Sequence, residues 1–345
     1  MTSPSVRVSV FGKSDLGLTR EHNEDTFLVA DLSSGNANLQ PDVRSHEVGP
    51  RGSLFMVADG MGGAAAGEVA SAMAADSIYR HLSTAWAEDA EVSAARFAYR
   101  MKEAVELANQ QIYAYAREHP DVRGMGTTVT AAGVLGDELY LAQIGDSRGY
   151  LIRNGETFQL TRDQSLTQRL VDAGELTEEE AEQSERRNII LQALGPDPRV
   201  KVDVSRQRLR RGDILILCSD GLSGVVRREE LSQIVAETAD LPSLCSALID
   251  LANERGGPDN VTVVAARFEG DGLPGPDSAD GAGYEVYDVP EEEVSEPPPV
   301  REHSPPAPLP PTAASIQPRP ASRPSDLLIV AALVALIALI LTALF

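Results

Sequence analysis

Four aspartates in this sequence share a local setting that suits metal chemistry. Asp59 and Asp220 each end an apolar run and precede a glycine, Asp146 follows a similar run, and Asp259 lies just before the last apolar stretch of the main domain. Each of them alone fits an ordinary turn or a helix cap. Together, carboxylates at the ends of several core strands could converge at one edge of the sheets, where they would repel one another unless cations neutralised them.

The atoms available in these motifs favour a hard divalent cation. Carboxylate oxygens without a nearby histidine or cysteine suit Mg²⁺ or Mn²⁺ and not zinc. Gly60 and Gly221, which follow two of the aspartates, let a backbone carbonyl approach an ion without a side chain in the way. Two such ions can activate a bridging water and hold phosphate oxygens for in-line attack, so the motifs indicate phosphoryl chemistry.

The hydrophobic pattern predicts strands that end at these motifs and helices grouped in pairs. We expect strands at 6–10, 26–30, 54–58, 127–135, 138–144, 150–153, 200–209, 213–218 and 261–268, and helices at 64–82, 93–117, 228–237 and 241–254. A capping box at 177–180 predicts a further helix start. Strands joined by tight turns, with paired helices, favour an α+β fold with antiparallel sheets over alternating βαβ units.

Composition divides the chain into three parts. Residues 1–269 read as a globular domain, and residues 270–325 read as an extended, mobile linker because they are rich in proline and acidic residues. Residues 326–345 contain an uncharged apolar run that as a helix would span roughly 28 Å, close to the hydrocarbon thickness of a bilayer. We therefore expect a C-terminal transmembrane helix, and Arg319 and Arg323 before it favour a cytoplasmic position for the domain that precedes it.

Charge and cysteine content exclude other classes of protein. The net charge of −22 argues against a nucleic-acid binder, which needs a basic surface to neutralise phosphates. Two cysteines cannot build a disulfide framework and favour a reducing compartment.

Six motifs, taken in order, resemble one protein family. They are Arg-Glu-His-Asn-Glu-Asp at 20–25, Ala-Asp-Gly-Met-Gly-Gly at 58–63, Gly-Met-Gly-Thr-Thr at 124–128, Gly-Asp-Ser-Arg at 145–148, Cys-Ser-Asp-Gly-Leu at 218–222 and Gly-Pro-Asp-Asn-Val-Thr at 257–262. This set resembles the bacterial metal-dependent PPM (PP2C-type) serine/threonine protein phosphatases over about residues 5–268. Among these, the chain looks like the membrane-anchored phosphatases that are paired with bacterial Ser/Thr kinases.

The resemblance implies a four-layer α/β/β/α sandwich of two antiparallel sheets, with a dinuclear metal cleft at one edge. Carried over by position, the ligands of two Mn²⁺ or Mg²⁺ ions are Asp59, which bridges them, the Gly60 carbonyl, Asp220 and Asp259. Asp146 resembles the ligand of a third metal.

The resemblance also implies roles for two residues that do not bind metal. Arg20 resembles the residue that clamps the substrate phosphate, and its planar fork matches two phosphate oxygens. Asp25 looks like the carboxylate that orders metal-bound water.

Two features of the family cannot be assigned to residues of this chain. Met61 and Ala64 stand where branches of the family carry a histidine, so the leaving-group acid is unassigned. Residues 164–188 fall where the family has a flap beside the cleft, and no catalytic residue is assigned there.

The expected activity is hydrolysis of phosphoserine and phosphothreonine in proteins by a metal-bridging water or hydroxide. The expected partners are phosphorylated proteins, bacterial Ser/Thr kinases with their substrates, and the lipid bilayer at the inner (cytoplasmic) membrane, crossed once. An alternative is a PPM-fold pseudophosphatase that acts by binding, which retention of the ligand positions argues against. A haloacid-dehalogenase-type phosphatase is excluded, because its Asp-x-Asp pair would need an aspartate where Met61 and Leu222 stand.

Overall fold

The structure is a computed structural model of the chain, and it describes residues 5–38, 42, 44–62, 66–276 and 281–290. The predicted transmembrane helix at 326–345 and the later part of the predicted linker lie outside these residues. Within the described ranges, no helix is both long and apolar enough to cross a membrane.

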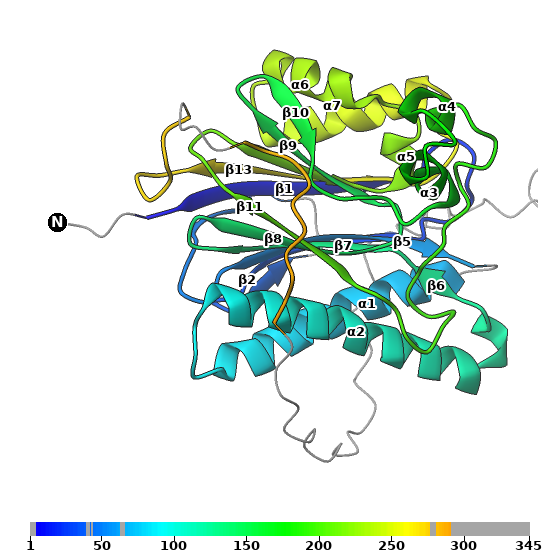
Figure 1. Ribbon diagram of the computed structural model, residues 1–345, viewed down its shortest axis with the longest axis horizontal. Coiled ribbons are helices and arrows are strands. Elements are labelled where there is room, and N and C mark those ends of the chain that lie inside the picture. Colours follow the sequence, from blue (N-terminus) through cyan, green and yellow to red (C-terminus); the bar gives the residue numbers. More distant parts are fainter. Residues whose placement is uncertain (1–4, 39–41, 43, 63–65, 277–280, 291–345) are drawn as a thin grey trace, which may run out of the picture. The chain divides into compact units, whose positions relative to one another are not determined.

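Two antiparallel sheets form the centre of the domain (Figure 1). The six-stranded sheet has the order β10 (Glu156–Gln159), β9 (Arg148–Arg153), β12 (Ile214–Cys218), β13 (Val261–Glu269), β1 (Arg7–Asp15) and β4 (Arg44–Glu47). The seven-stranded sheet has the order β11 (Asp203–Arg208), β8 (Glu138–Ile144), β7 (Val129–Leu135), β5 (Ser53–Met61), β2 (Asp25–Asp31) and β3 (Asn36–Asn38), and β6 (Gly126–Thr127) pairs with β5.

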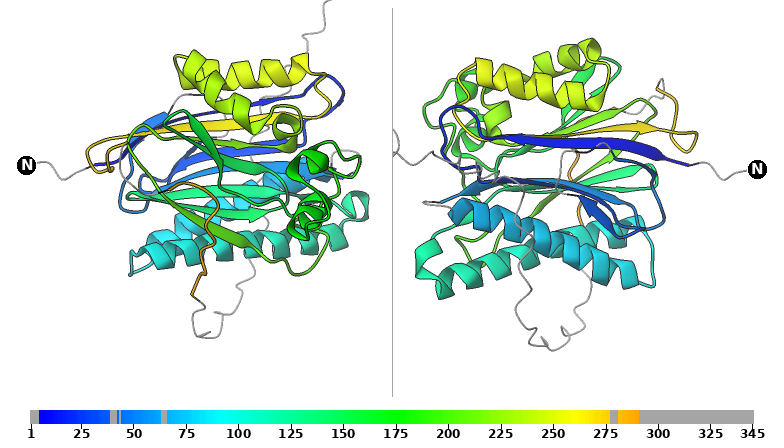
Figure 2. Two further views of the ribbon diagram at one scale, coloured as in Figure 1. Left: turned by 45° about the horizontal axis from the view of Figure 1, so that its top comes forward. Right: turned by 180° about the vertical axis from the view of Figure 1, so that it is seen from behind.

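Helices cover the outer face of each sheet (Figure 2). The long helices α1 (Ala66–His81) and α2 (Ala94–Glu118) lie on the seven-stranded sheet, and α6 (Arg228–Glu237) and α7 (Leu241–Glu254) lie on the six-stranded one. Short helical segments make up the rest: η1 (Leu82–Trp86), η2 (Pro120–Val122), α3 (Leu166–Asp172), α4 (Glu178–Glu182) and α5 (Asp220–Ser223). The predicted α/β/β/α sandwich is confirmed.

Side chains of the central strands alternate between the two faces of each sheet, and they form three apolar layers in the domain. In β5, Phe55 and Val57 pack between the two sheets, whereas Leu54 and Met56 pack under α1 and α2. Because successive side chains of a strand point to opposite faces, one continuous apolar run serves both layers. The same rule holds in β12, whose Leu215 lies between the sheets while its neighbours lie beneath α7.

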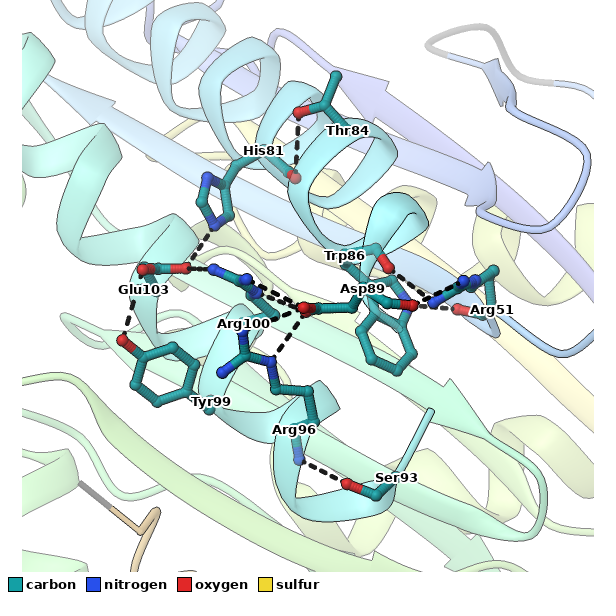
Figure 3. A network of polar contacts seen from close by, with 10 residues as sticks. All are labelled: Arg51, His81, Thr84, Trp86, Asp89, Ser93, Arg96, Tyr99, Arg100 and Glu103. Carbon is teal, nitrogen blue, oxygen red and sulfur yellow. Dashed lines mark hydrogen bonds and ion pairs between the residues drawn. The ribbon is translucent and has the colours of Figure 1, made fainter. Parts of the chain in front are cut away.

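A network of charges fastens the end of α1 to the start of α2 (Figure 3). The half-buried carboxylate of Asp89 accepts hydrogen bonds from the guanidinium groups of Arg96, at 2.9 and 3.0 Å, and of Arg100, at 2.6 and 3.1 Å. Arg51 binds the carbonyl oxygens of Trp86 and Asp89 at 2.8 and 2.9 Å. This cluster holds the π-helical turn η1, which carries the fully buried Trp86.

The folded domain continues beyond its predicted end at residue 269. Leu273 is 3% exposed and packs between the two sheets. Residues 281–290, called the strap below, run alongside β11, where Val286 forms a bridge with Ser205. The described part of 270–290 is therefore packed against the domain, which differs from the mobile linker expected there, because it buries apolar side chains and pairs with a strand.

Candidate metal and phosphate site

The strand register places two of the predicted site residues side by side. Asp25 at the start of β2 pairs with Asp59 near the end of β5. Gly60 follows and donates its N–H to the Glu24 carbonyl at 3.2 Å. A Cβ atom at this position would lie 2.3 Å from the Gly67 carbonyl oxygen, so the close approach of α1 requires a glycine here.

The other sheet contributes two more of the predicted ligands. Asp220 begins the short helix α5 directly after β12, and Asp259 lies in the loop before β13. Gly221 lets these two segments meet, because a Cβ atom there would lie 2.0 Å from the Asn260 carbonyl oxygen. The cluster is thus formed from both sheets.

Electrostatics show that the aspartates form one group. Loss of hydration and the nearby charges of Asp25, Asp220, Asp146 and Asp259 raise the pKa of Asp59 well above its usual range. The pKa of Asp220 is raised by desolvation and by Asp259. Four carboxyl groups with raised pKa values, those of Asp25, Asp59, Asp146 and Asp220, thus lie near one another and favour a bound cation.

Asp146 differs from the other aspartates in its burial. Its residue is 6% exposed, and desolvation together with the charges of Asp220 and Asp163 raises its pKa to about 8. Its Oδ1 atom is buried and has no hydrogen-bond partner among the described residues. A buried, unpaired carboxylate oxygen is costly, so this atom suits a ligand that brings positive charge.

The donor set fits Mg²⁺ or Mn²⁺, although the side chains are not in ligating geometry as they stand. In the described part of the chain, no three His, Cys, Asp or Glu side chains are grouped closely enough to hold an ion. The Asp59 carboxyl group instead lies close enough to Asp220 to oppose part of the rise in the Asp220 pKa, as it would with a proton shared between the two groups. Carboxylate oxygens and the Gly60 carbonyl are the donors that hard divalent cations prefer, and a cation can replace that shared proton.

Arg20 lies at the edge of this cluster. Its Nη2 atom pairs with Asp259 Oδ2 at 2.6 Å, while the side chain remains 52% exposed. The loop that carries it is fixed by the buried Asn260, whose Nδ2 donates to the carbonyls of Leu16 and His22 at 2.9 and 3.0 Å. Arg20 is thus held beside the aspartates with part of its guanidinium open to an incoming anion.

Hydroxyl groups hold two of the aspartates in place. Ser219 Oγ donates to Asp25 Oδ2 at 2.7 Å. Thr128 donates its N–H to the Asp59 carbonyl at 2.8 Å and accepts the Asp59 N–H on Oγ1 at 3.1 Å. The Thr128 hydroxyl also bonds the Ser147 hydroxyl at 2.7 Å, which links the Asp59 loop to the loop of Asp146.

The flap segment contributes residues that the sequence prediction missed. Gln164 accepts the Gly145 N–H on Oε1 at 3.0 Å and donates its own N–H to the Gly145 carbonyl at 2.9 Å, which clamps the residue before Asp146. Arg187 lies near enough to Asp220 to lower the pKa of that carboxyl group, against the larger effect of desolvation. The predicted capping box is present, with Thr177 and Glu180 bonded reciprocally.

Comparison with known proteins identifies the family. The model of the family described as protein phosphatase 2C matches residues 34–253. The chain belongs to this family. The serine/threonine phosphatase stp of Listeria monocytogenes is 38% identical over 253 residues, which cover 73% of this chain and 92% of that protein. PstP of Mycobacterium tuberculosis is 40% identical over 257 residues, covering 74% of this chain and 44% of PstP.

Solved structures agree with the family assignment. The crystal structure of the M. tuberculosis phosphatase PstP/Ppp has a TM-score of 0.64 and 36% identity, and covers 76% of this chain and 99% of that chain. A second structure, the PstP catalytic domain in complex with two manganese ions, has a TM-score of 0.62 and 35% identity and covers 76% of this chain and 99% of that one. The chain is a metal-dependent protein serine/threonine phosphatase of the PP2C family.

Proposed function

We propose that this phosphatase holds two Mn²⁺ or Mg²⁺ ions between Asp59, the Gly60 carbonyl, Asp220 and Asp259, and a third ion at Asp146. The observation that carries this proposal is the convergence of carboxyl groups that raise one another's pKa values, together with the unpaired buried oxygen of Asp146. The structure of the related PstP catalytic domain in complex with two manganese ions supports our proposal that two ions bind between Asp59, Asp220 and Asp259.

Arg20 and Asp25 have separate roles in the proposed hydrolysis of the phosphate ester. Such ions, when bound, supply positive charge for the phosphate oxygens and lower the pKa of a water molecule. Arg20 orients the phosphate with its exposed nitrogens, because a guanidinium fork binds two oxygens at once. Asp25, fixed by Ser219, accepts a hydrogen bond from the attacking water and so holds it in place.

The substrates we propose are proteins phosphorylated on serine or threonine, including Ser/Thr kinases and their targets at the inner membrane. Residues 327–345 would cross the bilayer once and leave the catalytic domain in the cytoplasm, which the uncharged apolar run and the arginines before it support. If the full chain fractionated without detergent as a soluble protein, this location would be wrong.

Phosphate release from a phosphothreonine peptide tests the proposed chemistry. We expect release in Mn²⁺ or Mg²⁺, loss of release after EDTA treatment, and recovery on adding back either ion. Elemental analysis of the active protein should find at least two bound ions per chain. Full activity in an EDTA-treated protein that contains no metal would contradict the proposal.

A further inference from the structure

The strap adds a strand to the free edge of the seven-stranded sheet. The Arg206 N–H donates to the Glu285 carbonyl at 2.9 Å, and the Tyr287 N–H donates to the Val204 carbonyl at 2.8 Å. Since β11 is the last strand of its sheet, these bonds occupy its outer side (Figure 1).

Side chains fasten the strap along its length. The Tyr287 ring lies 5.2 Å from the Tyr140 ring, edge to face, and the Arg206 guanidinium lies 5.6 Å from the centre of the Tyr287 ring. Arg206 also pairs with Glu285 at 3.2 Å. Nearer the start of the strap, the Gly281 carbonyl accepts bonds from Arg153 and Gln207, each at 3.3 Å.

The strand that the strap covers leads directly to the active site. The first residue of β11, Asp203, accepts a hydrogen bond from Gln164 Nε2 at 3.0 Å. The same Gln164 side chain accepts the Gly145 N–H on its Oε1 atom, and Asp146 is the next residue. The Gln164 side chain therefore joins β11 to the loop of the buried, unpaired carboxylate.

One residue of the strap, Tyr284, lies near the base of the flap. The charges of Asp203, Arg162 and Asp172 all act on the half-buried hydroxyl of Tyr284, whose pKa is raised chiefly by desolvation. Arg162 and Asp172 form an ion pair with each other, and Asp172 is the last residue of α3. Tyr284 is thus close to both β11 and α3.

We propose that the strap is a positioning element of the active site, which holds β11 and, through Gln164, the loop that carries Asp146. The inference rests on the proposed role of Asp146 as a metal ligand. Its consequence is that residues beyond the motif-bearing part of the chain set the metal dependence of the enzyme. Because the strap lies within the segment predicted as a linker, residues 270–325, whatever displaces the strap would also alter that dependence.

Substitution of Tyr287 in the full chain tests the inference. Tyr287→Ala removes the ring between Tyr140 and Arg206, and we expect the Mn²⁺ concentration for half-maximal activity to rise about fivefold, the lower end of coupling between distant sites. Gln164→Leu removes the side-chain bonds to Asp203 and to the Gly145 N–H, and should raise this concentration on the order of tenfold, as loss of partners behind a metal ligand does. Tyr287→Leu keeps the apolar bulk and serves if the alanine variant does not fold.

A matched control variant distinguishes a specific effect on the position of the Asp146 loop from a general loss of domain stability. Tyr113 in α2 also lies under an arginine, with the Arg117 guanidinium 5.7 Å from its ring centre. Tyr113→Ala should leave the Mn²⁺ dependence unchanged. In an Asp146→Asn background, Tyr287→Ala should change activity by less than about twofold, since positions that act through one group are not additive.

The possible outcomes distinguish the inference from the proposed function. A lowered melting temperature with unchanged Mn²⁺ dependence in both Tyr287 variants would overturn the positioning role, as would a fully additive effect with Asp146→Asn. Abolished activity in Asp146→Asn itself would place this residue in the main metal pair and overturn the inference with it. A wild-type chain without metal-dependent activity would instead contradict the proposed function.

Discussion

Asp59 occupies the position where a change of a single group should matter most, because four other aspartates act on its carboxyl group. Asp59→Asn removes a negative charge and leaves a neutral amide, which cannot bridge two cations as a carboxylate does. Substitution of residues that only support a metal ligand lowers metal affinity or activity by about 10–100-fold. For a metal ligand itself we therefore expect kcat to fall at least on the order of 100-fold.

The measurement is phosphopeptide hydrolysis in saturating Mn²⁺. Asp121→Asn, in an exposed turn of η2, makes the same chemical change elsewhere and should leave kcat unaltered. Turnover like that of the wild type in Asp59→Asn would show that the assigned metal ligands are wrong.

Arg20 should affect substrate binding more than turnover. Arg20→Lys replaces a planar fork by a point charge, and the loss of one charge-assisted hydrogen bond to phosphate corresponds to roughly a tenfold rise in KM. The kcat value should change little, because the aspartates are untouched. A collapsed kcat with an unchanged KM would assign Arg20 to the transition state alone.

Which residues could be predicted depends on how local their signals are. Asp59, Asp146 and Asp220 follow apolar runs and Asp259 precedes one, so the sequence alone predicts that they lie at strand ends. Gln164 acts on Gly145 across a loop, and Asn260 acts on the carbonyls of Leu16 and His22. Nothing in the local sequence reveals such contacts, because tertiary packing alone makes them.

At the scale of elements, the central strands were predictable and several peripheral ones were not. The predicted segment at 54–58 falls within β5, and the one at 213–218 covers the whole of β12. The residues at 54–58 and 214–218 are all buried and all apolar, because these strands are covered on both faces. The strand β4, at the edge of its sheet, reads Arg-Ser-His-Glu and β10 reads Glu-Thr-Phe-Gln. Strands with so few apolar residues give no periodic signal.

The charge network at the α1–α2 junction should contribute measurably to stability. Desolvation alone would raise the pKa of Asp89, but hydrogen bonds from Arg100 and Arg96 outweigh it and lower the pKa to about 2. Asp89→Asn leaves two arginines without their shared partner, so we expect the free energy of unfolding at neutral pH to fall by about 2 kcal/mol.

The pH dependence of this effect has a defined sign. A carboxyl group whose pKa is lower in the folded state than its ordinary 3.8 stabilises the fold above that value, and loses this effect as the pH falls towards 2. Urea unfolding of both proteins should therefore show a difference that shrinks from about pH 4 downward. Asp76→Asn, which breaks the ion pair with Arg80 on the surface of α1, is the control and should cost less than about 1 kcal/mol. A difference between wild type and Asp89→Asn that is constant with pH would contradict this account.

For the whole molecule, the domain boundary decides how the chain can be shortened. A chain that ends at residue 269 lacks the buried Leu273 and the Tyr287 ring, and should be less stable than one ending at residue 290 by about 2–4 kcal/mol. Urea unfolding of the two shortened chains measures the difference. Equal midpoints would show that residues 270–290 contribute nothing to the stability of the domain.

The strap has a further consequence for self-association. Without it, the Val204 carbonyl and the Arg206 N–H would be left on an open strand edge, where another copy of the chain could pair with them and start aggregation. With it, the outermost strand carries Glu285, Asp288 and Pro290, residue types that discourage further pairing. The strap thus protects the sheet against polymerisation, and the enzyme should stay monodisperse at concentrations where a chain cut before the strap precipitates.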